Sequence, residues 1–176
     1  MNAKTLVIGY GNMLRCDDGA GPHAVERIAA LYPSVDCIAC TELGPELAEV
    51  ISHYNRIVFV DASAGIKHLR WNMLQPRIEA ASCRPQSHAL SAQVLVELSI
   101  ELYNRCPLFI ELVEIPAYDF DFAEQLSPLT RVMVDRFVRL FSETLSWTDV
   151  RELQLWTDRA SMADQFALPV LQTSTS

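Results

Sequence analysis

The sequence predicts a single three-layer α/β domain. We expect a mostly parallel, twisted five-stranded sheet with helices on both faces, of the phosphorylase/hydrolase-like kind. Three observations support this fold class. Short apolar runs at 5–8 and 56–60 are typical of strands buried on both faces. Amphipathic helical stretches alternate with such runs, which indicates parallel strands joined by helices. The length of 176 residues suits one domain with a sizeable core.

In the first half of the chain, glycine and proline mark the ends of the elements. Gly9 stops the first apolar run, and Pro22 lies where the first turn of a helix tolerates proline. The run R-I-V-F-V ends at Asp61. In chain order, we expect a strand at 5–8, a helix at 20–31, a strand at 35–40, a helix at 45–54, a strand at 56–60 and a weaker, possible edge strand at 69–74.

In the second half, capping residues and apolar spacing define the helices. Ser87 is expected to cap a helix that starts at His88, and Ser127 a final helix. Pro116 is expected to end the last strand. In chain order, we expect a loop at 75–87, a helix at 88–104, a strand at 107–115, an acidic aromatic loop at 118–122 and a helix at 128–145. Residues 1–147 would form the domain, and 148–176 a partly disordered extension.

Composition restricts the classes of function. A net charge of −8 argues against nucleic acid or an anionic membrane as a partner. The first residues resemble neither a signal peptide nor a spanning helix, so we expect a cytoplasmic protein with reduced thiols. The C-x-x-C spacing of Cys37 and Cys40 could indicate redox chemistry or half a zinc site. Its place inside a predicted strand favours core packing instead.

The loop after the first strand carries the main signal. Gly9 and Gly11 resemble the start of a dinucleotide fingerprint, but Leu14 occupies the position of its third glycine. The adjacent carboxylates of Asp17 and Asp18 would also repel a phosphate. These aspartates could simply form a turn and cap the next helix. Two neighbouring carboxylates also favour a counter-charge such as a metal ion.

Three polar residues are expected at one edge of the sheet. Asp18 follows the first strand, Asp61 ends the third, and His88 begins a later helix. Two carboxylates and an imidazole could form an open site for zinc, nickel or manganese. They could equally form a general acid–base set. Each residue alone is better explained as a cap or a surface residue, but the three together favour a functional site.

Three sequence elements resemble those of the [NiFe]-hydrogenase maturation endopeptidases. They are G-x-G-N-x-L-x-x-D-D-G-x-G at 9–21, I-V-F-V-D-A at 57–62 and S-H-A-L at 87–90. The resemblance implies a peptidase, aspartic-type or metal-assisted, that removes the C-terminal extension of a hydrogenase large-subunit precursor after nickel insertion. It implies Asp18, Asp61 and His88 as catalytic and metal-contacting residues, with nickel carried by the substrate and zinc or cadmium as other metals for the site. We expect a monomer.

The chain departs from the family after the second strand, where many members carry D-G-G-T. Here T-E-L-G-P-E-L-A occupies 41–48, a form associated with bidirectional, cytoplasmic hydrogenases. We therefore expect Glu42 to contact the substrate, together with Gly11, Asn12 and Asp17. A nickel-dependent chaperone that holds the large subunit without cutting it is the alternative function. A Rossmann-like nucleotide-binding protein is a third, less favoured because of the acidic loop.

Overall fold

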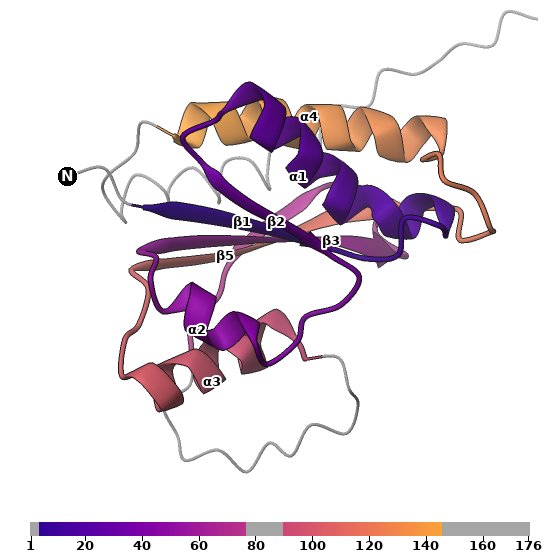
Figure 1. Cartoon of the computed structure of the whole chain (residues 1–176). Coiled ribbons are helices and arrows are strands. Elements are labelled where there is room, and N and C mark those ends of the chain that lie inside the picture. The colour runs from indigo at the N-terminus through magenta and orange to yellow at the C-terminus, as the bar shows by residue number, and fades with distance from the viewer. Residues whose placement is uncertain (1–3, 77–89, 146–176) are drawn as a thin grey trace, which may run out of the picture.

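The computed structural model describes residues 4–76 and 90–145. Its elements form three layers, a sheet between two pairs of helices (Figure 1). The expected extension at 148–176 lies outside the described residues. In chain order the elements are β1 (Thr5–Tyr10), a 3-10 helix η1 (Cys16–Gly19), α1 (Ala20–Leu31), β2 (Asp36–Cys40), α2 (Leu47–Ile51), β3 (Arg56–Ala64), β4 (Arg70–Met73), α3 (Ala92–Tyr103), β5 (Phe109–Ala117) and α4 (Pro128–Thr144).

The five strands are ordered β2-β1-β3-β5-β4. All neighbouring pairs are parallel except β4 and β5, so β4 is an antiparallel edge strand. The predicted α/β class, the central position of β1 and β3, and the edge position of β4 are confirmed. Residues 6–8 of β1 and 57–60 of β3 are wholly buried because helices cover both faces of the sheet.

A separate apolar core lies on each face of the sheet. Helices α1 and α4 cover one face, and α2 and α3 cover the other (Figure 1). Alternate residues of each strand enter alternate cores. The α1/α4 core includes Val7, Ile28, Val58, Val113, Phe137 and Phe141. The α2/α3 core includes Leu6, Ile8, Ile51, Phe59, Leu95 and Ile110.

Strands β3 and β5 are longer than predicted. The prediction that Asp61 ends its strand is wrong, because β3 continues to Ala64 and pairs with β5 along its whole length. Pairing with β1 stops at Val60, so Asp61 is the first residue of β3 beyond its neighbour. Pro116 lies within β5 rather than ending it. Strand β4 pairs only with residues 111–114, so Pro116 lies where β5 has no strand on that side.

Helix α3 starts later than predicted. It begins at Ala92, and the Ser91 hydroxyl accepts a hydrogen bond from the Val94 amide at 3.3 Å. The expected start at His88 is therefore wrong, and Ser87 is not the cap of this helix. Both residues lie outside the described residues. The predicted cap of α4 is confirmed, because the Ser127 side chain accepts a hydrogen bond from the Thr130 amide.

A buried ionic network joins α4 to the amino ends of β3 and β5. The Arg56 guanidinium donates to both carboxylate oxygens of Glu111, at 2.7 and 3.1 Å. It also donates to the backbone oxygen of Thr144 at 3.1 Å and to its hydroxyl at 2.9 Å. The Trp71 indole donates to Glu111 at 2.8 Å. The network fixes the last turn of α4 against the sheet.

The C-x-x-C cysteines of β2 pack on opposite faces of the sheet. Cys37 contacts the α1/α4 core, whereas Cys40 contacts the α2/α3 core. Both are free thiols. Their placement confirms core packing and excludes a shared redox or zinc site, because side chains on opposite faces cannot meet. Within residues 4–76 and 90–145, no helix combines the length and apolar character needed to cross a bilayer.

Candidate functional site

Two glycines of the first motif are required by close packing between backbones. A Cβ atom at Gly9 would lie 2.2 Å from the carbonyl oxygen of Gly21. A Cβ atom at Gly21 would lie 2.4 Å from the carbonyl oxygen of Val60. The first turn of α1 therefore lies directly on β1 and β3, at the carboxyl ends of these strands. This contact explains the glycines without a bound phosphate.

Another glycine of this motif, Gly11, shapes the loop that holds Asp18. Gly11 has a φ of 136°, and a Cβ atom there would lie 1.9 Å from the Asp18 carbonyl oxygen. The Asn12 amide donates to Asp18 Oδ2 at 2.7 Å. The Asn12 side chain accepts from the Leu14 amide at 2.9 Å and keeps the turn closed. Asp18 is half-buried, and its Oδ1 has no hydrogen-bond partner among the described residues.

Asp17 has a structural role instead of the expected substrate contact. Its side chain is completely buried and accepts backbone hydrogen bonds from Tyr118, Asp119 and Ser127 at 2.7–3.0 Å, and one from the Ser127 hydroxyl. Burial alone would raise the pKa of Asp17, but the hydrogen bonds from Tyr118 and Ser127 lower it below its ordinary value. Asp17 thus joins the first loop to the segment 118–127.

Asp61 lies in a different electrostatic environment. Burial raises the pKa of its carboxyl to about 6, and the negative charges of Asp18 and Glu114 act in the same direction. A hydrogen bond from the Tyr10 hydroxyl and one from the Ala62 amide partly oppose this increase. Burial and the neighbouring Asp61 in turn raise the pKa of Tyr10, so its hydroxyl stays protonated. The charge of Asp18 thus contributes to the raised pKa of Asp61, and the convergence of the two carboxylates on one metal stays a prediction.

Sequence reasoning missed Tyr10 and Glu114. Glu114 is the register partner of Asp61 on β5, and it accepts a hydrogen bond from Ser63 at 3.2 Å. The apolar strand I-E-L-V-E-I contains two glutamates, Glu111 and Glu114, three positions apart. An odd separation places them on opposite faces of the sheet. That spacing could have indicated one glutamate toward α4 and another beside Asp61.

The remaining predicted residues are placed as follows. Glu42 is exposed in the loop after β2. His88 lies outside the described residues, so its place as a third metal ligand stays a prediction. Within residues 4–76 and 90–145, no three histidine, cysteine or acidic side chains are grouped to hold a metal ion. Gly11 and Asn12 line a cavity of about 280 Å³; its other lining residues are Met13, Leu14, Pro22, Ala39, Cys40 and Thr41.

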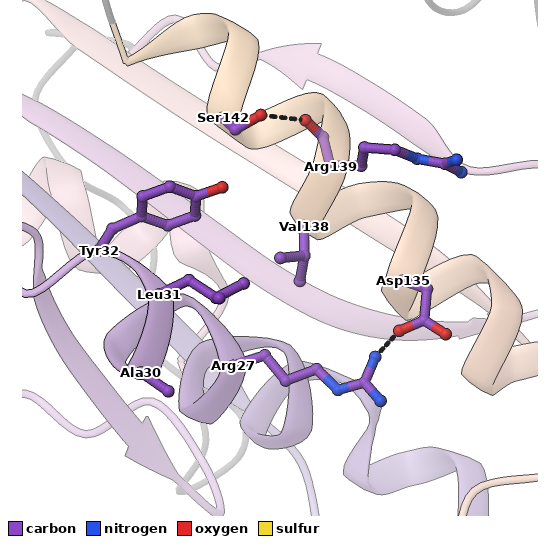
Figure 2. A pocket seen from close by; sticks show the side chains of 8 residues that line it. All are labelled: Arg27, Ala30, Leu31, Tyr32, Asp135, Val138, Arg139 and Ser142. Atoms are coloured by element: carbon purple, nitrogen blue, oxygen red, sulfur yellow. Dashed lines mark hydrogen bonds and ion pairs between the residues drawn. The ribbon is translucent and has the colours of Figure 1, made fainter.

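A larger cavity lies away from these carboxylates. It measures about 550 Å³ and lies between the carboxyl-terminal half of α1 and α4 (Figure 2). An ion pair between Arg27 and Asp135 closes one side, and Leu31, Tyr32 and Val138 contribute apolar surface (Figure 2). Because α1 runs back along the sheet, this cavity lies toward the amino ends of the strands. It is therefore separate from the candidate site.

Comparison with known proteins gives consistent relatives, although no family model matches the chain. The hydrogenase expression/formation protein HupD of Bradyrhizobium diazoefficiens is 25% identical over 152 residues, covering 81% of this chain and 78% of that protein. The maturation protease HycI of Thermococcus kodakarensis superposes with a TM-score of 0.62 at 21% identity, covering 82% and 94% of the two chains. The maturating endopeptidase HybD of E. coli gives 0.62 at 18% identity, covering 81% and 91%.

The fold and the loop of Asp18 define a class of protein. This is an α/β protein with the architecture of the solved hydrogenase maturation proteases, with an acidic site at the carboxyl edge of its sheet. The first-loop motif occupies residues 9–21, and the similarity to HupD covers 81% of the chain. The chain is thus similar in sequence to HupD and shares the fold of the solved hydrogenase maturation proteases HycI and HybD.

Proposed function

We propose that this protein is an endopeptidase that removes the C-terminal extension of a [NiFe]-hydrogenase large-subunit precursor after nickel insertion. The observation that supports this most directly is that Asp18, in the loop after β1, and Asp61, near the carboxyl end of β3, both lie at the carboxyl edge of the sheet, where the charge of Asp18 influences Asp61. Ligands of open α/β sheets bind at that edge. The names of HycI and HybD as a maturation protease and a maturating endopeptidase agree with it.

The two aspartates are suited to different tasks. The Asn12 amide fixes Asp18 through one oxygen and leaves the other oxygen available. Asp61, with a pKa of about 6, can exchange a proton near neutral pH. The Tyr10 hydroxyl beside Asp61 partly opposes the rise in its pKa. Two carboxyl groups in different environments form a usual arrangement for acid–base hydrolysis, in which one group positions water and the other transfers protons.

The charges at this edge suit a cation supplied by the substrate. Among the described residues, none of the four ion pairs involves Asp18, Asp61 or Glu114. Carboxylate oxygens are ligands for divalent metals, and the sequence resemblance adds His88 as a third. We propose that the nickel of the loaded precursor is recognised here, with zinc or cadmium as possible substitutes. When bound, such an ion would polarise the scissile carbonyl.

The segment T-E-L-G-P-E-L-A at 41–48 supports a cytoplasmic, bidirectional hydrogenase as the source of the precursor. It places the exposed Glu42 beside the carboxyl end of β2, where a substrate can reach it. We propose that the enzyme acts on this precursor in the cytoplasm, as a monomer.

The test compares nickel-loaded and nickel-free precursor, each incubated with metal-free enzyme and analysed by mass spectrometry. We expect cleavage of the loaded precursor only, and none with Asp61→Asn. Asp135→Asn, which alters an acidic residue on the far face, is the matched control and should cleave normally. Equal cleavage of both precursors would contradict nickel recognition. Stable binding without any cleavage would instead support the chaperone.

A further inference from the structure

Among the residues that the structure describes, no strand pairs with the outer edge of β2, which lies beside the candidate site. The sheet order leaves β1 as its only strand neighbour among the described residues. The Cys40 carbonyl accepts a hydrogen bond from the Gly11 amide at 3.1 Å, so the backbone of Cys40 faces β1. Backbone groups alternate sides along a strand, which directs the N–H and C=O of Ala39 to the outer edge. Ala39 is exposed.

The cavity of about 280 Å³ lies at the carboxyl end of this edge. Ala39, within β2, and Thr41, the residue directly after β2, line one side of the cavity. Met13, Leu14 and Pro22 line it from the first loop and α1, and Leu14 is 57% exposed. The cavity is thus mainly apolar, and its size suits one substrate side chain. It adjoins the candidate site, because its lining residue Asn12 also binds Asp18.

We propose that an extended segment of the protein substrate adds as a strand to the outer edge of β2 and places an apolar side chain in this cavity. The inference rests on the proposed peptidase function, since a peptidase must hold its substrate backbone extended near the reacting groups. Strand addition supplies main-chain hydrogen bonds for affinity and a pocket for specificity. The exposed carboxylate of Glu42, just beyond β2, favours a segment that is not acidic, whereas Asp36 at the start of β2 is paired with Lys4.

The sheet geometry locates this segment relative to the cleaved bond. Neighbouring strands lie about 4.8 Å apart, so a strand added to β2 lies three spacings, about 14 Å, from β3 and Asp61. An extended chain advances about 3.3 Å per residue, so about four residues separate the cavity from the scissile bond. The cavity therefore binds the side chain of a substrate residue that lies about four residues from the cleaved bond.

The first test uses the full chain and nickel-loaded large-subunit precursor. Ala39→Pro removes the outward N–H, and Asp135→Asn, on the far face of the sheet, serves as the control. We expect Ala39→Pro to raise KM at least about tenfold with kcat within about twofold, and Asp135→Asn to change neither, because the lost interaction binds ground and transition states alike. Thr41→Trp, which fills the cavity, should also raise KM. An unchanged KM in folded Ala39→Pro and Thr41→Trp would overturn the inference.

The second test does not depend on cleavage. Amide hydrogen exchange of the wild-type chain, with and without the same precursor, should show protection at Ala39 and none at residues 27–32 beside the other cavity. Exchange at Ala39 that the bound precursor leaves unchanged would refute strand addition, whatever the activity. Protection at Ala39 without cleavage would support the binding edge while contradicting the proposed peptidase.

Discussion

Replacing Asp17 by asparagine should destabilise the domain far more than expected for a polar residue in a predicted loop, because the Asp17 side chain is completely buried. Asp17 Oδ1 accepts the Ser127 amide, and Oδ2 accepts the Tyr118 and Asp119 amides and the Ser127 hydroxyl. An asparagine NH₂ group cannot accept hydrogen bonds. The asparagine side chain can be oriented in two ways, and the less costly one puts the NH₂ group at the Oδ1 position. The buried Ser127 amide then faces another donor.

The expected loss follows from these four bonds. One unsatisfied buried amide costs about 1–3 kcal/mol. Each of the other three bonds changes from charge-assisted to neutral, which costs up to about 1 kcal/mol each. Partial relaxation of the loop reduces the sum, so we expect Asp17→Asn to lower the free energy of unfolding by about 1–5 kcal/mol. For a chain of this size the middle of that range corresponds to a decrease of about 10 °C in Tm.

Urea unfolding followed by circular dichroism at several pH values measures this loss. The pKa of Asp17 is lowered in the folded state. Its contribution is therefore present above the unfolded pKa of about 3.9 and is lost as pH falls through the lower folded value. Asp119→Asn is the matched control, since Asp119 is exposed and accepts only the Asp121 amide with its side chain. Equal losses in the two variants, or a difference that does not shrink in acid, would refute the reasoning.

Four other changes should have distinct outcomes. Gly21→Ala should lower the yield of folded protein and cost at least about 3 kcal/mol, because the new methyl group would meet backbone carbonyls of β1 and β3; thermal unfolding measures it. Asp61→Asn should abolish cleavage yet stabilise the metal-free protein by up to about 3 kcal/mol at pH 7, at about 1.4 kcal/mol per pKa unit. The raised pKa means that wild-type stability is lost as pH rises from about 4 through about 6, and this difference should vanish in acid. Tyr10→Phe removes a hydrogen bond that lowers the pKa of Asp61, so the acid limb of the cleavage profile should move to higher pH. Glu111→Ala should cost about 3–5 kcal/mol in denaturant unfolding, because Arg56 stays buried without its partner.

The elements predicted most accurately from sequence were those whose local signals agree with their environment. The run 57–60 is apolar throughout because helices cover both faces of the sheet there, and Ser127 caps α4 as its position indicates. Strand ends were less predictable. Asp61 and Pro116 resemble terminators, yet pairing between β3 and β5 continues past both. That pairing is a tertiary interaction between residues far apart in the chain, so no local pattern reports it.

The candidate site shows the same limit. Asp17 and Asp18 are adjacent in a single motif, but one is wholly buried, and the other is half-buried with one oxygen that accepts no hydrogen bond from the described residues. What distinguishes them is the segment 118–127, which folds over Asp17 and is about a hundred residues distant in sequence. Tyr10 and Glu114 join the site for a similar reason, because sheet register alone brings them beside Asp61.

The buried network of Arg56 and Glu111 lies at the end of the sheet opposite the candidate site. It fastens the last turn of α4 at the amino ends of the strands, whereas Asp18 and Asp61 lie at the carboxyl ends. The polypeptide therefore leaves the described domain at Leu145 on the side remote from the reacting groups. Anything joined at that point, whether a natural extension or a laboratory fusion, begins its path where it does not obstruct a substrate approaching the opposite edge.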